Sequence, residues 1–187
     1  MQEAEFTLAV IIGSNREGRR GHIVADWFRR EAEISDRFNV SVIDLARLSV
    51  PGHFPDVPGG DIEWLLHQLR DAHAMVIVTP EYNHGYPASV KQAIDLTGEA
   101  WYAKPVGFVS YGGASGGIRA VEQLRQIIPE LRAVSTRTSV SIPNFSDFIA
   151  GNDRFNPPTA CVNASVAMLD ELAWWCGVIQ RGQRVSV

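Results

Sequence analysis

Three segments of the 187-residue chain combine glycine with residue types that bind anions or ring systems. They read GSNREGRRGH (residues 13–22), TPEYNHGYP (79–87) and SYGGASGG (110–117). Each follows a short apolar run, so each is predicted to be a loop at the end of a strand. Their composition indicates that these loops contact a ligand.

The first segment has the chemistry of a phosphate site. Gly13 permits a sharp turn after the strand, and the helix that follows offers free backbone N–H groups and the positive end of its dipole. Ser14 adds a hydroxyl group. Arg16, Arg19 and Arg20 add positive charge that suits phosphate. A solvated basic turn is the alternative, but an anion site is the better interpretation in a chain whose formal net charge is −4.

The spacing of this segment argues against two common nucleotide sites. Gly13 and Gly18 satisfy G-x-x-x-x-G, but arginines occupy the positions where a P-loop has Lys and Ser/Thr. Without that hydroxyl, a nucleotide hydrolase loses its magnesium anchor. The G-x-G-x-x-G pattern of pyrophosphate binding is also absent, because Ser14 and Asn15 follow Gly13. A ligand with a single phosphate group is the interpretation that remains for this segment.

The third segment contains a hydrolase motif that the chain does not complete. Gly113 to Gly117 satisfies G-x-S-x-G between a predicted strand and a predicted helix. A hydrolase of that architecture needs a histidine after the serine, and all five histidines precede Ser115. The glycines are better explained by a backbone that approaches a flat ligand closely, with an ordinary flexible turn as the alternative.

The second segment carries aromatic and amide side chains that a simple connector does not need. Glu81, Tyr82 and Asn83 can present hydrogen-bonding groups to the edge of a ring, although a buried aromatic plug explains any one aromatic equally well. His84 is not expected to bind metal, because no partner stands at a ligand spacing. One phosphate loop and two ring loops together describe a mononucleotide site.

Strands and helices alternate along the chain. Apolar patterning predicts strands at 6–14, 38–45, 74–78 and 104–111 and a fifth within 133–142, with helices over 23–31, 62–73, 89–96, 118–131 and 160–180. Asp61 is expected to cap the second helix, and Pro129 to disturb the fourth. The expected fold is α/β: a flavodoxin-like three-layer sandwich with a five-stranded parallel sheet, order 2-1-3-4-5, in one domain over residues 1–187. In that order the three segments meet at the switch point, where such folds hold FMN.

The composition of the chain argues against some classes of binding partner and indicates a cellular compartment. The acidic balance argues against a nucleic-acid surface, and no apolar run approaches the ~20 residues of a membrane span. The first ten residues lack the pattern of a signal peptide. Cys161 and Cys176 have no metal-site spacing and are expected to be buried thiols, so a reducing cytoplasm is predicted.

The same segments resemble a known family. GSNREGRRGHIVADWF (13–28), VIVTPEYNHGYPASVKQAIDL (76–96) and SYGGASGGIRAVEQLR (110–125) are similar to the flavodoxin-like NAD(P)H-dependent FMN reductases, which include quinone, azo-dye and chromate reductases. The resemblance runs from about Phe6 to Leu131, and its middle motif is the most specific. It implies FMN as cofactor, NADPH or NADH as co-substrate, and a small electron acceptor.

The resemblance also implies the site residues. Ser14 and Arg16 would hold the FMN phosphate near the start of the first helix, the loop at 80–83 would border the isoalloxazine ring, and the loop at 110–113 would contact its other polar edge. Many members carry Ser and Asn where this chain has Arg19 and Gly21, and an arginine can replace those hydrogen bonds with a charge. The expected cofactor-binding set is Ser14, Arg16, Arg19, His22, Pro80, Glu81, Tyr82, Asn83, Ser110, Tyr111, Gly112 and Gly113, with no metal ligand and no catalytic acid or base.

Other functions stay open at this point. The first is a flavodoxin-type electron carrier without its own NAD(P)H reductase activity, which the dispersed acidic residues and basic loops disfavour. The second is an interaction module that binds no flavin. The family usually forms homodimers, sometimes homotetramers, and residues 143–155 (PNFSDFIAGNDRF) are expected either at such an interface or lid, or at a buried sheet edge. Arg119, which follows the third segment, is expected to form a salt bridge at the helix surface, with contact to an anionic substrate as the alternative.

Overall fold

A computed structural model of the chain describes residues 6–185. The strands are β1 Phe6–Ile12, β2 Phe38–Asp44, β3 Ala74–Pro80, β4 Pro105–Tyr111, β5 Val134–Ser135, β6 Val140–Ile142, β7 Ile149–Ala150 and β8 Arg154–Phe155. The α-helices are α1 Gly21–Ile34, α2 Asp61–Asp71, α3 Ala88–Thr97, α4 Ile118–Ile127 and α5 Thr159–Val185. Short 3₁₀ helices occupy Leu45–Arg47, Gly98–Trp101, Ile128–Leu131, Phe145–Phe148 and Gly151–Asp153.

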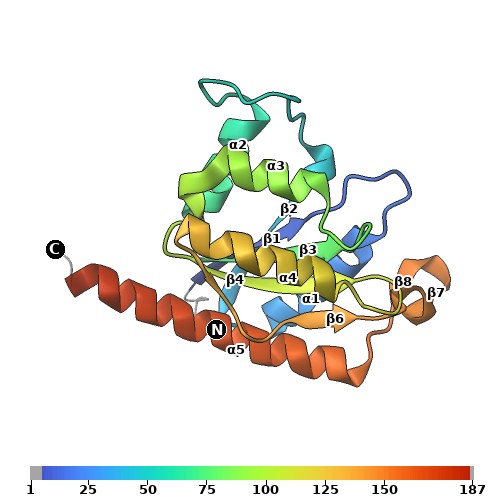
Figure 1. Cartoon of the computed structure of the whole chain (residues 1–187). Helices are drawn as coiled ribbons and strands as arrows, with labels where there is room; N and C mark the ends of the chain where they lie inside the picture. The colour runs from blue at the N-terminus through green and yellow to red at the C-terminus, as the bar shows by residue number, and fades with distance from the viewer. Residues whose placement is uncertain (1–5, 186–187) are drawn as a thin grey trace.

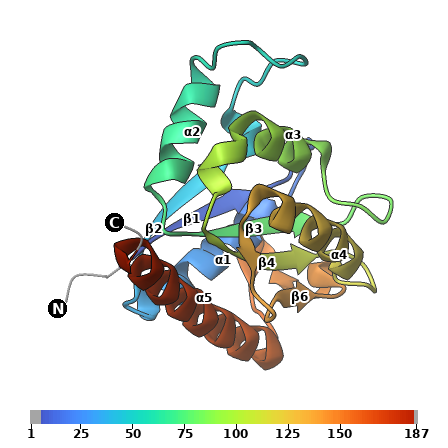
Figure 2. The same ribbon diagram turned by 60° about the vertical axis from the view of Figure 1, so that its left-hand side comes forward.

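The main sheet is parallel and has the order β2-β1-β3-β4-β5, which confirms the predicted flavodoxin-like arrangement. Helices α1 and α5 cover one face, and α2, α3 and α4 cover the other (Figures 1 and 2). Successive residues of β3 serve opposite cores, because side chains alternate along a strand. Val76 and Val78 pack with α1 and α5, while Met75 and Ile77 pack with the other three helices. Burial on both faces explains why these strands read as continuous apolar runs.

The predicted fifth strand is divided in two. Both β5 and β6 pair with β4, and residues 136–139 between them leave the ladder. The carboxylate of Glu171 on α5 accepts the backbone N–H groups of Arg137 (2.7 Å) and Thr138 (2.9 Å). On the other side, Arg125 of α4 donates to the carbonyl oxygens of Thr136 and Arg137. The break is therefore stabilised by charged groups from helices on both faces of the sheet.

Two predictions about helix ends have different outcomes. Pro129 ends α4 as expected, since the helix stops at Ile127 and continues as a 3₁₀ turn. The prediction that Asp61 caps α2 was wrong: Gly60 is the N-cap, and no side chain caps this helix. Asp61 Oδ2 instead accepts the backbone N–H of Ser49 at 2.7 Å, and so ties the irregular loop before α2 back to the helix.

Other expectations concern the cysteines and the segment at 143–155. Cys161 and Cys176 are both buried, as predicted. The segment forms two 3₁₀ turns and the small β7–β8 hairpin, and Phe155 packs edge-on against Trp27 of α1 with 5.5 Å between ring centroids. Among residues 6–185, no helix is long and apolar enough to cross a membrane.

Replacing Glu171 with Gln is expected to lower the free energy of unfolding by about 1–2 kcal/mol, because two backbone N–H groups lose a charged acceptor. Burial alone would raise the pKa of Glu171, but the bonds from Thr138 and Arg137 outweigh it, and the pKa lies below its ordinary value. The unfolded chain therefore binds the proton first. This stabilisation is present above the unfolded pKa of about 4.3 and is lost as the pH falls through the folded pKa.

Urea unfolding at about pH 7 and about pH 3.5 measures this dependence, with the deficit of the variant shrinking in acid. Glu130→Gln, at an exposed position on the 3₁₀ turn after α4, is the control and should stay within about 0.5 kcal/mol of wild type. A deficit for Glu171→Gln that is equal at both pH values would contradict the role given to its carboxylate.

Candidate functional site

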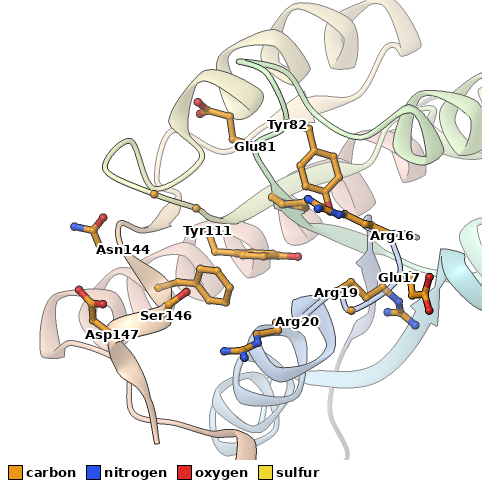
Figure 3. A pocket seen from close by; sticks show the side chains of 15 residues that line it. Arg16, Glu17, Arg19, Arg20, Glu81, Tyr82, Tyr111, Asn144, Ser146 and Asp147 are labelled. Atoms are coloured by element: carbon orange, nitrogen blue, oxygen red, sulfur yellow. The ribbon is translucent and has the colours of Figure 1, made fainter.

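A cavity of about 570 Å³ opens at the carboxyl edge of the sheet, where the loops after β1, β3 and β4 converge (Figure 3). All three segments singled out in the sequence contribute to its wall. The lining residues are Arg16, Glu17, Gly18, Arg19, Arg20, Pro80, Glu81, Tyr82, Tyr111, Gly112, Gly113, Asn144, Phe145, Ser146 and Asp147. A volume of this size falls in the range of small-molecule and cofactor sites.

Arginines dominate one end of the cavity. The Arg19 side chain is mostly buried, and its Nη2 donates to Asp44 Oδ2 at 2.7 Å. Its other terminal nitrogen, Nη1, is buried and has no hydrogen-bond partner in the described part of the chain. Arg16 and Arg20 are exposed, and no described carboxylate lies within 4 Å of either guanidinium. This end therefore combines net positive charge with a buried guanidinium nitrogen that has no partner among the described residues.

The first turn of α1 lies beside these arginines. The helix begins at Gly21 without a side-chain cap, so its first N–H groups are available to a ligand. A Cβ atom at Gly21 would lie 2.6 Å from the Tyr111 hydroxyl, so only glycine lets the tyrosine pack onto this turn. Burial, and secondarily the neighbouring Tyr82, raises the pKa of Tyr111. The Tyr111 hydroxyl therefore stays protonated at neutral pH and can donate a hydrogen bond.

The loop after β3 is a tight hairpin. Tyr82 and Gly85 exchange backbone hydrogen bonds of 2.8 and 2.9 Å, and the two residues between them, Asn83 and His84, have φ angles of 49° and 67°. Positive φ at both central positions is the pattern of a type I′ turn, which Asn adopts more readily than most residues. Asn83 lies exposed at the tip of this turn and does not line the cavity.

The hairpin is fastened to α4 at two points. The Glu81 carboxylate turns away from the cavity and accepts the backbone N–H of Arg119 at 3.1 Å and its Nη1 at 2.9 Å (Figure 3). Gln123 Nε2 donates to the carbonyl oxygen of His84 at 3.1 Å. Burial alone would raise the pKa of Glu81, but the bonds from Arg119 and Ser115 outweigh it, and the pKa lies below its ordinary value. The salt bridge expected of Arg119 is thus confirmed, and its partner is Glu81.

Three further sequence-predicted residues lie behind the cavity or beside it. Ser14 is fully buried, and its hydroxyl lies 2.6 Å from the Tyr82 hydroxyl, so it supports the hairpin from below. Ser110 is also buried and donates to the carbonyl oxygen of Gly116 at 2.8 Å, across the loop after β4. His22 is exposed and lines a separate cavity of about 470 Å³ that also includes Trp64.

Residues 144–147 line the cavity but were missing from the predicted site. Asn144 and Phe145 donate their backbone N–H groups to the carbonyl oxygens of Gly113 (2.9 Å) and Gly112 (3.2 Å). The Phe145 ring packs edge-on against Tyr111, with 4.9 Å between centroids. The position of this segment in the sequence could have indicated that it reaches the cavity. It directly follows the last predicted strand and therefore leaves the sheet at the same edge as the other three loops.

The residues fit a ligand with one phosphate and one flat, polar-edged ring. The unpartnered Arg19 nitrogen and the start of α1 suit a phosphate, and the hairpin and glycine loop present backbone groups to a ring. Within residues 6–185, no group of three or more His, Cys, Asp or Glu side chains is placed to hold a metal ion.

Comparison with known proteins agrees with this geometry. Residues 6–147 match the model of the family described as NADPH-dependent FMN reductase. An NAD(P)H-dependent FMN reductase of Saccharomyces cerevisiae is 31% identical over 160 residues, covering 73% of this chain and 81% of the relative. A quinone reductase of Escherichia coli K12 is 30% identical over 164 residues, covering 83% and 84%.

The fold is shared with a solved flavoenzyme, the NAD(P)H:(acceptor) oxidoreductase FerB from Paracoccus denitrificans. The two structures superpose with a TM-score of 0.74 at 21% sequence identity. The aligned region covers 92% of this chain and 97% of the FerB chain. The family match spans most of the chain and includes every segment that lines the cavity. The chain therefore belongs to the NADPH-dependent FMN reductase family.

Proposed function

We propose that this protein is an NAD(P)H-dependent FMN oxidoreductase, with FMN in the 570 Å³ cavity and a small molecule as the final electron acceptor. The observation that carries the proposal is the meeting of an arginine-rich end and two ring-bordering loops at the switch point of the sheet. A quinone, an azo dye, free flavin or a metal oxyanion is the proposed acceptor class. When bound, FMN supplies the hydride chemistry, and the protein supplies binding and orientation.

The proposed roles of the cofactor-binding residues follow from their places around the cavity. Arg16, Arg19 and the first turn of α1 near His22 bind the phosphate. The backbone from Pro80 to Asn83 borders the ring, with Glu81 fixing that backbone and Ser14 supporting it through Tyr82. The loop from Ser110 to Gly113 meets the other edge of the ring. No side chain is assigned as a catalytic acid or base.

Tyr111 has a separate role in this proposal. Its buried hydroxyl stays protonated and lies at the first turn of α1, between the phosphate end and the ring end of the cavity. With the Phe145 ring against it, Tyr111 closes the floor of the site to water.

An electron carrier of the flavodoxin type is the second candidate, because it shares the strand order. Carriers dock partners through complementary charge, usually through an acidic surface. Here Arg16 and Arg20 flank the cavity mouth without carboxylate partners among the described residues. These two exposed arginines favour small anionic nucleotides over a basic protein partner.

The proposal extends to the whole molecule. Residues 1–187 are proposed to form one FMN-binding domain that works in the cytoplasm as a homodimer or homotetramer. The two buried cysteines, which have no metal-site spacing, support a reducing compartment, and the resemblance to the family supports the assembly. Nucleic acid and membranes are not proposed as partners, in line with the net charge of −4.

Anaerobic absorption spectroscopy tests the function directly. Purified protein is mixed with FMN, and spectra are recorded before and after addition of NADPH or, separately, NADH. We expect the flavin bands to shift on binding and to bleach with at least one donor, far faster than in an enzyme-free control. A bound flavin that neither donor reduces would establish the carrier instead. A flavin spectrum that the protein leaves unchanged would remove the cofactor from the proposal.

Replacing Glu81 with Gln is expected to weaken FMN and riboflavin binding alike, by about 5- to 30-fold, because the hairpin at the ring end loses a charge-assisted bond worth about 1–2 kcal/mol. Fluorescence titration of both flavins measures the change. Glu122→Gln is the matched control, since Glu122 is an exposed carboxylate on α4, the helix that carries Arg119, and has only a long 3.8 Å ion pair. A loss confined to FMN would show that Glu81 acts on the phosphate end and not on the ring.

A further inference from the structure

The ion pair between Arg19 and Asp44 joins two elements that the chain separates by 25 residues. Asp44 is the last residue of the edge strand β2, where it lies opposite Ile12 of β1 in the parallel register. Arg19 belongs to the loop that runs from the end of β1 to α1. The pair therefore spans from the sheet edge to the turn that precedes the first helix.

Both oxygens of the Asp44 carboxylate are occupied. Oδ1 accepts the backbone N–H of Ala46 at 3.1 Å, at the start of the 3₁₀ turn that follows β2. Oδ2 accepts Arg19 Nη2 at 2.7 Å, and the exposed Arg47 reaches the same oxygen at 3.5 Å. Only 11% of the Asp44 side chain is exposed. Because backbone and strand fix this carboxylate, it acts as a rigid support for the guanidinium.

This support determines what the rest of the guanidinium can do. The group is planar and its donors form a rigid fork, so holding Nη2 also sets the direction of Nη1. Nη1 is the one buried side-chain nitrogen or oxygen in the described residues that has no partner. A buried N–H without an acceptor is energetically unfavourable. A phosphate oxygen is an acceptor for which a guanidinium is well suited.

The charged side chains at the arginine end of the cavity have two different roles. Arg19 and Asp44 together are neutral, so the pair contributes a directed donor and almost no net charge. Arg16 and Arg20 are exposed and supply the long-range attraction, which salt screens. Removing the Asp44 charge would leave the positive charge of Arg19 without an offsetting carboxylate and its side chain free to turn. Electrostatic attraction then predicts tighter phosphate binding in that variant, and loss of orientation predicts weaker binding.

We propose that Asp44 is a positioning residue that directs Arg19 toward the phosphate of the flavin, and that it thereby selects flavins that end in a phosphate monoester over riboflavin. The proposal deepens the proposed function and rests on it, because it assumes that the cavity binds FMN. It assigns Asp44 no contact with the ligand.

The test compares FMN with riboflavin on wild type, Asp44→Asn and Arg19→Met, by titration of flavin fluorescence and calorimetry on the apoprotein. Asparagine keeps an oxygen for the Ala46 N–H, so the 3₁₀ turn is retained. We expect Asp44→Asn to weaken FMN binding about 10-fold or more and to leave riboflavin within about twofold, which corresponds to the loss of one oriented charge-assisted bond. In the Arg19→Met background, Asp44→Asn should cause no further loss, because the two residues act through one bond.

Asp170→Asn is the matched control. It breaks another Arg–Asp pair, with Arg37 at 2.9 Å, on the surface of α5 and away from the cavity, and should change neither affinity. Equal losses of FMN and riboflavin in Asp44→Asn would reveal a purely structural role, and tighter FMN binding would show that net charge prevails over orientation. Either result overturns the positioning role while wild-type protein still binds and reduces FMN. Failure of wild type to bind FMN would remove the proposed function and this inference together.

Discussion

The register in which β1 pairs with β2 and β3 determines every contact around the cavity. Ile12 at the end of β1 lies opposite Asp44 of β2 and Val78 of β3, and Pro80 of β3 lies opposite Tyr111 of β4. Side chains alternate along a strand, so a slip of one residue would turn Asp44 or Tyr111 to the other face. Such a slip would also move each apolar side chain into the opposite core and disrupt its packing against the helices on that face. The forces that fix the core therefore also fix the site.

The two ends of the cavity are held by different kinds of interaction. At the arginine end, a buried ion pair of 2.7 Å and the first turn of α1 are oriented by the end of the edge strand. At the other end, a hairpin is held against α4 by the Glu81 carboxylate, and from below by the hydroxyl pair of Ser14 and Tyr82. Electrostatic orientation suits a ligand group with fixed charge, while backbone groups on a stiff turn suit the edge of a ring. The asymmetry of the site thus matches the asymmetry of a mononucleotide.

Sequence patterns were sufficient for features that depend on local chemistry. The apolar runs predicted the strand order, and the composition of the segments at 13–22, 79–87 and 110–117 predicted which loops would meet. They were insufficient where distant residues decide the structure. The divided fifth strand depends on Glu171, more than 30 positions downstream, and the segment at 144–147 reaches the cavity through that division. Asp44 gave no signal either, because an aspartate at the end of a strand is ordinary until Arg19 is placed beside it.

The structure explains the residues Arg19 and Gly21 together. Glycine at position 21 leaves space for the Tyr111 hydroxyl, which lies where the Cβ of any other residue would begin. With that space filled by tyrosine, no side chain at position 21 can hydrogen-bond an anion at the first turn of α1. The donors must then come from the flanking loop, and a single long side chain can reach the turn only if something fixes its direction. In the role proposed for it, Asp44 fixes that direction from the neighbouring strand, so the proposal links the tyrosine, the glycine and the ion pair in holding a charged group at this turn.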